Sequence, residues 1–145
     1  MPERLHYPAG LYGPTPIPDL SDREIRRRLS PTALKAFFRI ADRWSLRDQD
    51  ARDLLGGVSH GAFYEMKKSS DRILDTDMLT RLSLLIGIYK ALNVLYSEKL
   101  ADAWIQLPNT NPLFSGRPPL ASMIAGGIPA MQTIRRLLDA RRGGV

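Results

Sequence analysis

The sequence contains no cysteine and only two histidines, His6 and His60. Without cysteine the chain can form no disulfide, has no thiolate nucleophile and offers no sulfur ligands for zinc. Two histidines far apart in the sequence are too few to build a histidine-ligated metal centre. We therefore expect neither a metal site nor a bound cofactor.

Long apolar runs are also scarce. No uninterrupted apolar stretch approaches the roughly 20 residues that a membrane-spanning helix needs. The first 20 residues hold five of the 11 prolines and lack the apolar segment of a signal peptide. These features predict a cytoplasmic protein with no membrane partner. Residues 1–20, rich in proline and glycine, are predicted to form a flexible arm.

The composition that is present suits a small folded protein. The chain has 145 residues, of which 43% are hydrophobic, so it can bury a core as one domain or as two small ones that share it. Its net charge of +6 favours a polyanionic partner, because basic side chains displace counterions from a phosphate backbone. Charge alone permits nucleic-acid binding and does not establish it.

Apolar residues recur at helical spacing along most of the chain, and no segment has the pattern of a strand, so the fold class is predicted to be all-α. Ser21 is predicted to cap the first helix, with Glu24 completing a capping box. Ser30 and Pro31 are predicted to end that helix and begin the next. The predicted helices cover residues 21–29, 30–44, 46–55, 59–68, 75–96, 97–107, 120–125 and 129–142.

Residues 46–68 have the pattern of a helix-turn-helix. Ala51 is the small residue that lets two helices cross, Gly56 and Gly57 supply the tight turn, Val58 is the apolar residue after it, and Ser59 caps the second helix. Ala51 lies five residues before Gly56, one more than the usual spacing. Either the turn holds an extra residue or the small position has been assigned one turn away.

A recognition helix presents its first residues to base edges and its later basic residues to phosphates. On this basis the predicted DNA-binding residues are Arg47, Ser59, His60, Gly61, Ala62, Tyr64, Lys67 and Lys68. Simpler explanations stay open: His60 as an exposed residue at a helix start, and Lys67 and Lys68 as a solvated helix end. A helix-turn-helix can also serve only as a protein-binding scaffold. With these alternatives open, we predict that residues 21–70 form a DNA-binding domain and that residues 71–145 form a second domain.

The second half resembles a known family in three successive strings: RLSLLIGIYKALNVLY, ADAWIQLPNTNPLFSGRPPLASMIAGG and IPAMQTIRRLLDARRG. They are similar to the toxin-binding domain of Xre–MbcA–ParS-type antitoxins, and the preceding segment resembles the Xre-like helix-turn-helix found with it. Together they cover about residues 25–143. The double proline of FSGRPP departs from the single proline that relatives often have.

That resemblance implies an antitoxin paired with a RES-fold toxin that depletes cellular NAD. NAD would be the substrate of the toxin and not a cofactor of this chain. The antitoxin would self-associate as a homodimer or in a larger complex with the toxin, repress its own operon, and obstruct the toxin's active site with its C-terminal segment. The predicted toxin-binding residues are Arg135, Arg136, Asp139, Arg141, Arg142, Gly143, Gly144 and Val145.

Simpler interpretations of the C-terminal residues also stay open. Arginines followed by glycine at a helix end are ordinary capping chemistry. Phe114 is either a core residue or an exposed anchor, with the core favoured, and Trp44 and Trp104 are expected in the core. No nucleophile–base pair or carboxylate pair is evident, so we predict no enzyme activity. The alternatives are a stand-alone dimeric helix-turn-helix regulator and a DNA-partitioning adaptor.

Overall fold

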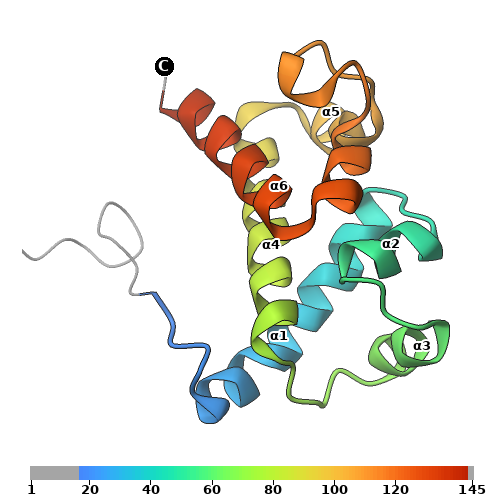
Figure 1. Ribbon diagram of the computed structural model, residues 1–145, viewed down its shortest axis with the longest axis vertical. Helices are drawn as coiled ribbons and strands as arrows, with labels where there is room; N and C mark the ends of the chain where they lie inside the picture. The colour runs from blue at the N-terminus through green and yellow to red at the C-terminus, as the bar shows by residue number, and fades with distance from the viewer. Residues whose placement is uncertain (1–16, 144–145) are drawn as a thin grey trace, which may run out of the picture.

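A computed structural model describes residues 17–143, and within that range every regular element is helical (Figure 1). The all-α prediction is confirmed. The elements are α1 (Arg23–Arg43), α2 (Asp48–Leu54), α3 (His60–Lys68), α4 (Thr76–Leu95), α5 (Glu98–Ala103), the 3₁₀ turns η1 (Trp104–Gln106) and η2 (Pro112–Phe114), and α6 (Pro119–Arg142).

Helix α4 is the centre of the fold, with α1 packed along one side and α6 along another (Figure 1). Seven of its 20 residues are buried: Leu79, Leu82, Leu85, Gly87, Ile88, Ala91 and Leu92. By length and composition α4 could cross a membrane. Burial between two neighbouring helices explains the same apolar composition, since a helix that is apolar on two faces packs inside a protein.

Helix α1 is continuous, so the predicted break at Ser30 and Pro31 is wrong. A proline inside a helix removes one backbone donor and usually kinks the helix. Here Ser30 is fully buried, and its hydroxyl donates to the Arg26 carbonyl at 2.6 Å while accepting the Leu74 N–H at 2.9 Å. This tertiary contact to the segment before α4 holds the helix together where the local sequence suggested a boundary.

The start of α1 also differs from the prediction by one residue. Its N-cap is Asp22, whose carboxylate accepts the Glu24 N–H at 2.8 Å, and not Ser21. Ser21 instead bonds to Asp19 in the turn before the helix. The side chain of Glu24 pairs with Arg27, so the predicted capping box does not form. Serine and aspartate are both favoured N-cap residues, so the sequence alone does not decide between Ser21 and Asp22.

The predicted interruption of the last helix is present as a kink within α6. Gly127 has φ 62° and ψ −143°, a conformation open essentially to glycine alone, and helical segments continue on both sides of it. The two segments of α6 therefore point in different directions, and the second lies along α4.

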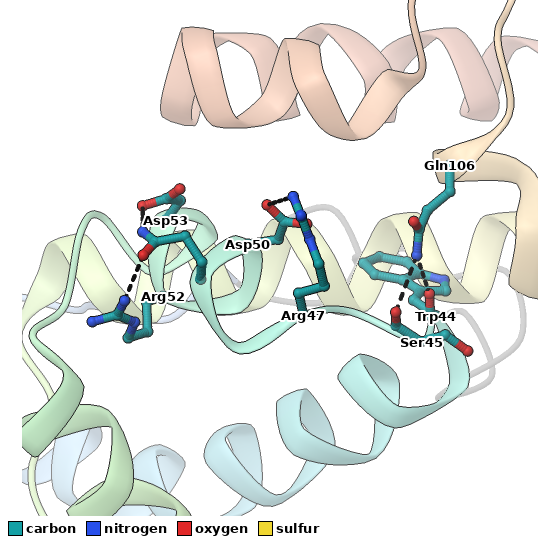
Figure 2. Close-up of polar contacts among 8 residues, drawn as sticks. Trp44, Ser45, Arg47, Asp50, Arg52, Asp53 and Gln106 are labelled. Atoms are coloured by element: carbon teal, nitrogen blue, oxygen red, sulfur yellow. Dashed lines mark hydrogen bonds and ion pairs between the residues drawn. The ribbon is translucent and has the colours of Figure 1, made fainter.

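Phe114, Trp44 and Trp104 are buried in the core, as predicted. Phe114 is 1% exposed and meets Trp104 edge to face, with ring centroids 6.0 Å apart. Trp44 is equally buried, and its carbonyl accepts a hydrogen bond from Gln106 (Figure 2). Of the predicted arm, residues 1–16 lie outside the described residues. The carbonyl of Leu20 is bound by Arg26 and Thr76, which ties the chain to the starts of α1 and α4.

Candidate functional site

The turn between α2 and α3 is built on two glycines with positive φ. Gly56 (φ +97°) donates to the Asp53 carbonyl at 3.0 Å, and Gly57 (φ +85°) donates to the Arg52 carbonyl at 2.9 Å. This pair of bonds is the Schellman ending of a helix, which needs a left-handed residue after the cap. Ala51 is 2% exposed, which is compatible with its predicted role as the small buried residue, and residues 55–59 separate α2 from α3.

Helix α3 is fixed by its cap and by two buried side chains. Ser59 accepts the Ala62 N–H at 3.2 Å, as expected for the N-cap. Phe63 and Met66 are 4% and 2% exposed, and the Phe63 ring lies 5.4 Å from that of Phe38 on α1. Because these residues anchor one face, the opposite face of α3 is presented outward.

The outward face carries most of the residues predicted to bind DNA. Ser59, His60, Gly61, Tyr64, Lys67 and Lys68 are exposed, while Ala62 is half-buried. Tyr64 is the largest of them and is 59% exposed. Small residues at the start of a helix, followed by a tyrosine and two lysines, form a surface that can approach a groove closely and contact the phosphates beside it.

Arg47 sits at the N-cap of α2, where 82% of its side chain is exposed (Figure 2). Its Nε lies 3.1 Å from Asp50 Oδ2, and this hydrogen bond, with the nearby charge, raises the pKa of Arg47. On the same helix Gln49 donates to Asp53 and accepts from Arg52. Arg47 therefore lies at the end of α2 away from the Gly56–Gly57 turn, and it already has a carboxylate partner, unlike the lysines of α3.

Comparison with known proteins bears on this region. Residues 22–87 match the family model described as the antitoxin Xre-like helix-turn-helix domain. Residues 22–87 therefore form an Xre-like helix-turn-helix domain of the antitoxin type. It is also 42% identical over 115 residues to an uncharacterized protein, y4oB, of Sinorhizobium fredii, an alignment that covers 79% of this chain and 87% of the relative. The match assigns α1–α3 and the first half of α4 to a DNA-binding antitoxin domain.

Beyond the antitoxin domain, the second segment of α6 buries Met131, Ile134 and Leu138 against the core. The arginines on its other face differ in their surroundings. Arg136 is exposed, with only a 3.4 Å contact to Thr133, whereas Arg141 donates to the hydroxyl of Tyr96 at 2.9 Å. The predicted toxin-binding residues thus do not form one free surface.

Asp139 organises two more of these arginines. Its carboxylate lies 3.0 Å from Arg135 Nε and 3.8 Å from Arg142 Nη1. The Arg135 guanidinium rests on α4 at Gly87, where any Cβ would collide with it. Arg142 is 39% exposed at its side chain and Gly143 is exposed, while Gly144 and Val145 lie outside the described residues.

Arg81 is a structural residue that the sequence did not single out. It pairs with Asp77 at 2.9 Å on α4, and its side chain is 17% exposed. A Cβ at Gly56 would lie 3.2 Å from its Nε, and one at Gly127 would lie 3.8 Å from its Nη2. The guanidinium therefore fills the space between the turn before α3 and the kink in α6. The sequence feature that could have identified Arg81 is its position as a charged residue within an otherwise apolar helix.

Proposed function

We propose that this chain is the antitoxin of a toxin–antitoxin pair and represses its own operon by placing α3 in the major groove of operator DNA. The observation that carries the proposal is the outward face of α3, which has small residues at its start and Tyr64, Lys67 and Lys68 after them. Helix-turn-helix proteins read bases with the first residues of this helix. Ser59, His60 and Gly61 would meet base edges, and the lysines would meet phosphates.

We also propose that the end of α6 blocks the active site of a RES-fold, NAD-depleting toxin. Arg136, Asp139, Arg142 and Gly143 are the described members of the predicted toxin-binding set that are exposed. Guanidinium groups bind carboxylates and polar backbone in a cleft with directional hydrogen bonds. The end of α6 and α3 lie at opposite corners of the molecule, an arrangement that supports simultaneous binding of DNA and toxin (Figure 1).

The remaining parts of the proposal follow the same family resemblance. The antitoxin would act in the cytoplasm as a homodimer or within a larger toxin complex, without enzymatic activity and without a cofactor of its own. Within residues 17–143 no three His, Asp or Glu side chains come together as ligands for a metal ion.

Co-expression with the product of the adjacent gene tests the pairing. The full chain should co-purify with that product and restore growth to cells that express it. A chain ending at Ala140 should still co-purify but fail to restore growth, because the blocking segment is gone. If neither version binds the neighbouring protein, the toxin assignment falls and a stand-alone regulator becomes the better account.

Point variants separate blocking from folding. Truncation at Ala140 also removes Arg141 and its bond to Tyr96, so a growth defect could reflect a loosened α6. Arg136→Gln together with Arg142→Gln removes two exposed guanidinium groups and leaves that bond in place. The matched control is Lys99→Gln with Arg117→Gln, which removes the same charge from two other exposed sites. Loss of growth rescue only in the first pair supports blocking by α6.

A further inference from the structure

A second basic feature lies beside α3. A hollow of about 350 Å³ opens between the second half of α1 and the end of α3. It is lined by Lys35, Phe38, Arg39, Asp42, Met66, Lys67, Lys68 and Ser70. Lys35 and Arg39 are one helical turn apart on α1, so their side chains project from the same face of the helix. The hollow thus joins basic residues from two helices that are separated in sequence.

The floor of the hollow is formed by packed apolar side chains. Met66 is 2% exposed, and Phe38 packs against Phe63 on α3 and against Phe37 within α1. These contacts fix the end of α3 against α1. The cations around the rim are therefore held at one site by the packing beneath them, and their proximity does not depend on the folding of a loose loop.

The four basic side chains of the hollow have no ion-pair partner within 4 Å among residues 17–143. Asp42 is the one acidic residue that lines it. Four cations against one carboxylate leave a local charge of +3. By contrast Arg27, Arg43, Arg47 and Arg81 each lie beside a carboxylate. Clustered cations repel one another, and a bound polyanion relieves that repulsion.

We propose that this hollow binds backbone phosphate of the DNA duplex, so that α1 takes part in DNA binding through Lys35 and Arg39. The proposal rests on the proposed operator binding by α3. The hollow lies at the end of the recognition helix, where such a helix leaves the groove and meets the flanking strand. Guanidinium and ammonium groups are the side chains that bind phosphate, and an unpaired set is free to do so.

The test compares two double variants of the full chain on two DNA duplexes. Lys35→Gln/Arg39→Gln removes the α1 half of the hollow, and Lys99→Gln/Arg117→Gln removes equal charge from residues that do not line it. One duplex carries the promoter region of the chain's own gene, and the other has the same length and composition in shuffled order. Affinity for each is measured as a function of salt concentration, and circular dichroism checks that all variants remain folded.

Loss of two phosphate contacts should reduce the magnitude of the slope of log affinity against log salt by about 1.8. Raising the salt from 50 to 200 mM should then weaken binding by a factor about 12-fold smaller than the factor for the wild-type chain. The Lys35→Gln/Arg39→Gln protein should weaken on both duplexes alike, because phosphates carry no sequence information. The control pair should keep the wild-type slope. A reduced slope in the first pair alone supports the phosphate site.

Other outcomes overturn the proposal. An unchanged slope in Lys35→Gln/Arg39→Gln, with DNA binding intact, would show that phosphate does not occupy the hollow and would favour an acidic protein segment there. Equal losses in both double variants would reveal a general charge effect.

A separate variant, His60→Ala/Tyr64→Ala, should lose preference for the promoter duplex yet keep the salt slope. Failure of the unmodified chain to bind either duplex would instead remove the proposed function itself.

Discussion

The end of α3 and the end of α6 are both basic, but their cations are held differently. Lys67 and Lys68 have no carboxylate partner within 4 Å in the described part of the chain. Arg135 and Arg142 share the carboxylate of Asp139, and Arg141 is bound to Tyr96. The two ends have similar numbers of basic residues, but only those of α6 have carboxylate or hydroxyl partners among the described residues.

The difference indicates what each end can do without rearrangement. A cation that already has a partner must exchange that partner for a ligand, which cancels part of the binding free energy. A cation without one gains the full attraction of a polyanion. The α3 end can therefore bind a polyanion without giving up an ion pair, while the α6 end presents Arg136 freely and the other arginines only in exchange for existing contacts.

The largest expected effect comes from reversing charge at the α3 end. Lys67→Glu with Lys68→Glu should lower DNA affinity on the order of 100-fold or more, because two attractive contacts become repulsive. Since both residues are exposed, thermal stability should stay close to wild type. Gel shift and thermal melting measure the two quantities. The charge-preserving pair Lys67→Arg/Lys68→Arg should bind, and retained binding by the glutamate pair would contradict the assignment.

A smaller effect is expected where a cation is held by a neutral group. Tyr96→Phe removes the acceptor of the Arg141 hydrogen bond and keeps the ring, so the free energy of unfolding should fall by about 1 kcal/mol. Urea unfolding measures the change. Tyr64→Phe is the matched control, because that residue is on the exposed face of α3 and should be neutral. Equal losses in the two variants would show that the Arg141 contact contributes nothing.

Removing the shared carboxylate makes the α6 end resemble the α3 end. Asp139→Ala should change the free energy of unfolding by less than about 0.5 kcal/mol, because partly exposed ion pairs contribute little and a negative charge near a helix C-terminus is unfavourable. Chemical denaturation provides the measurement. A loss several times larger would mean that Arg135 is part of the core, and the contrast between the two ends would then be one of packing.

The smallest effect concerns the exposed pair at the start of α1. The hydrogen bond from Arg27 lowers the pKa of Glu24, so this group stabilises the fold above its unfolded-state pKa and loses that contribution as pH falls through the folded-state pKa. Glu24→Gln should therefore melt slightly below wild type at neutral pH and equally with it in acid. Melting curves across this pH range test the sign, and a difference that grows in acid would refute it.

Much of the fold could be predicted from local patterns. The caps of α3 and α4 lie at Ser59 and Asp75, and the paired glycines end α2 as expected, because each of these signals acts within one helical turn. The break predicted at Ser30 and Pro31 failed because a buried bond to Leu74, 44 residues away, outweighs the local preference.

The site shows the same limit. The exposed face of α3 could be predicted from the spacing of Phe63 and Met66, since a helix buries one face. Lys35 and Arg39 could not be connected with it, because their nearness to Lys67 depends on how α1 and α3 pack. Nor does sequence reveal which arginines of α6 are already bound, since Tyr96 lies 45 residues from Arg141.

The position of α4 has a consequence for cooperativity. Its buried residues complete a single core with α1 on one side and α6 on the other. Loss of α6 would uncover leucines in the middle of the helix that also supports the DNA-binding half. We expect a chain built in this way to unfold as one unit, so that damage to the C-terminal segment reaches the exposed face of α3 through stability, without any signal passing between two bound partners.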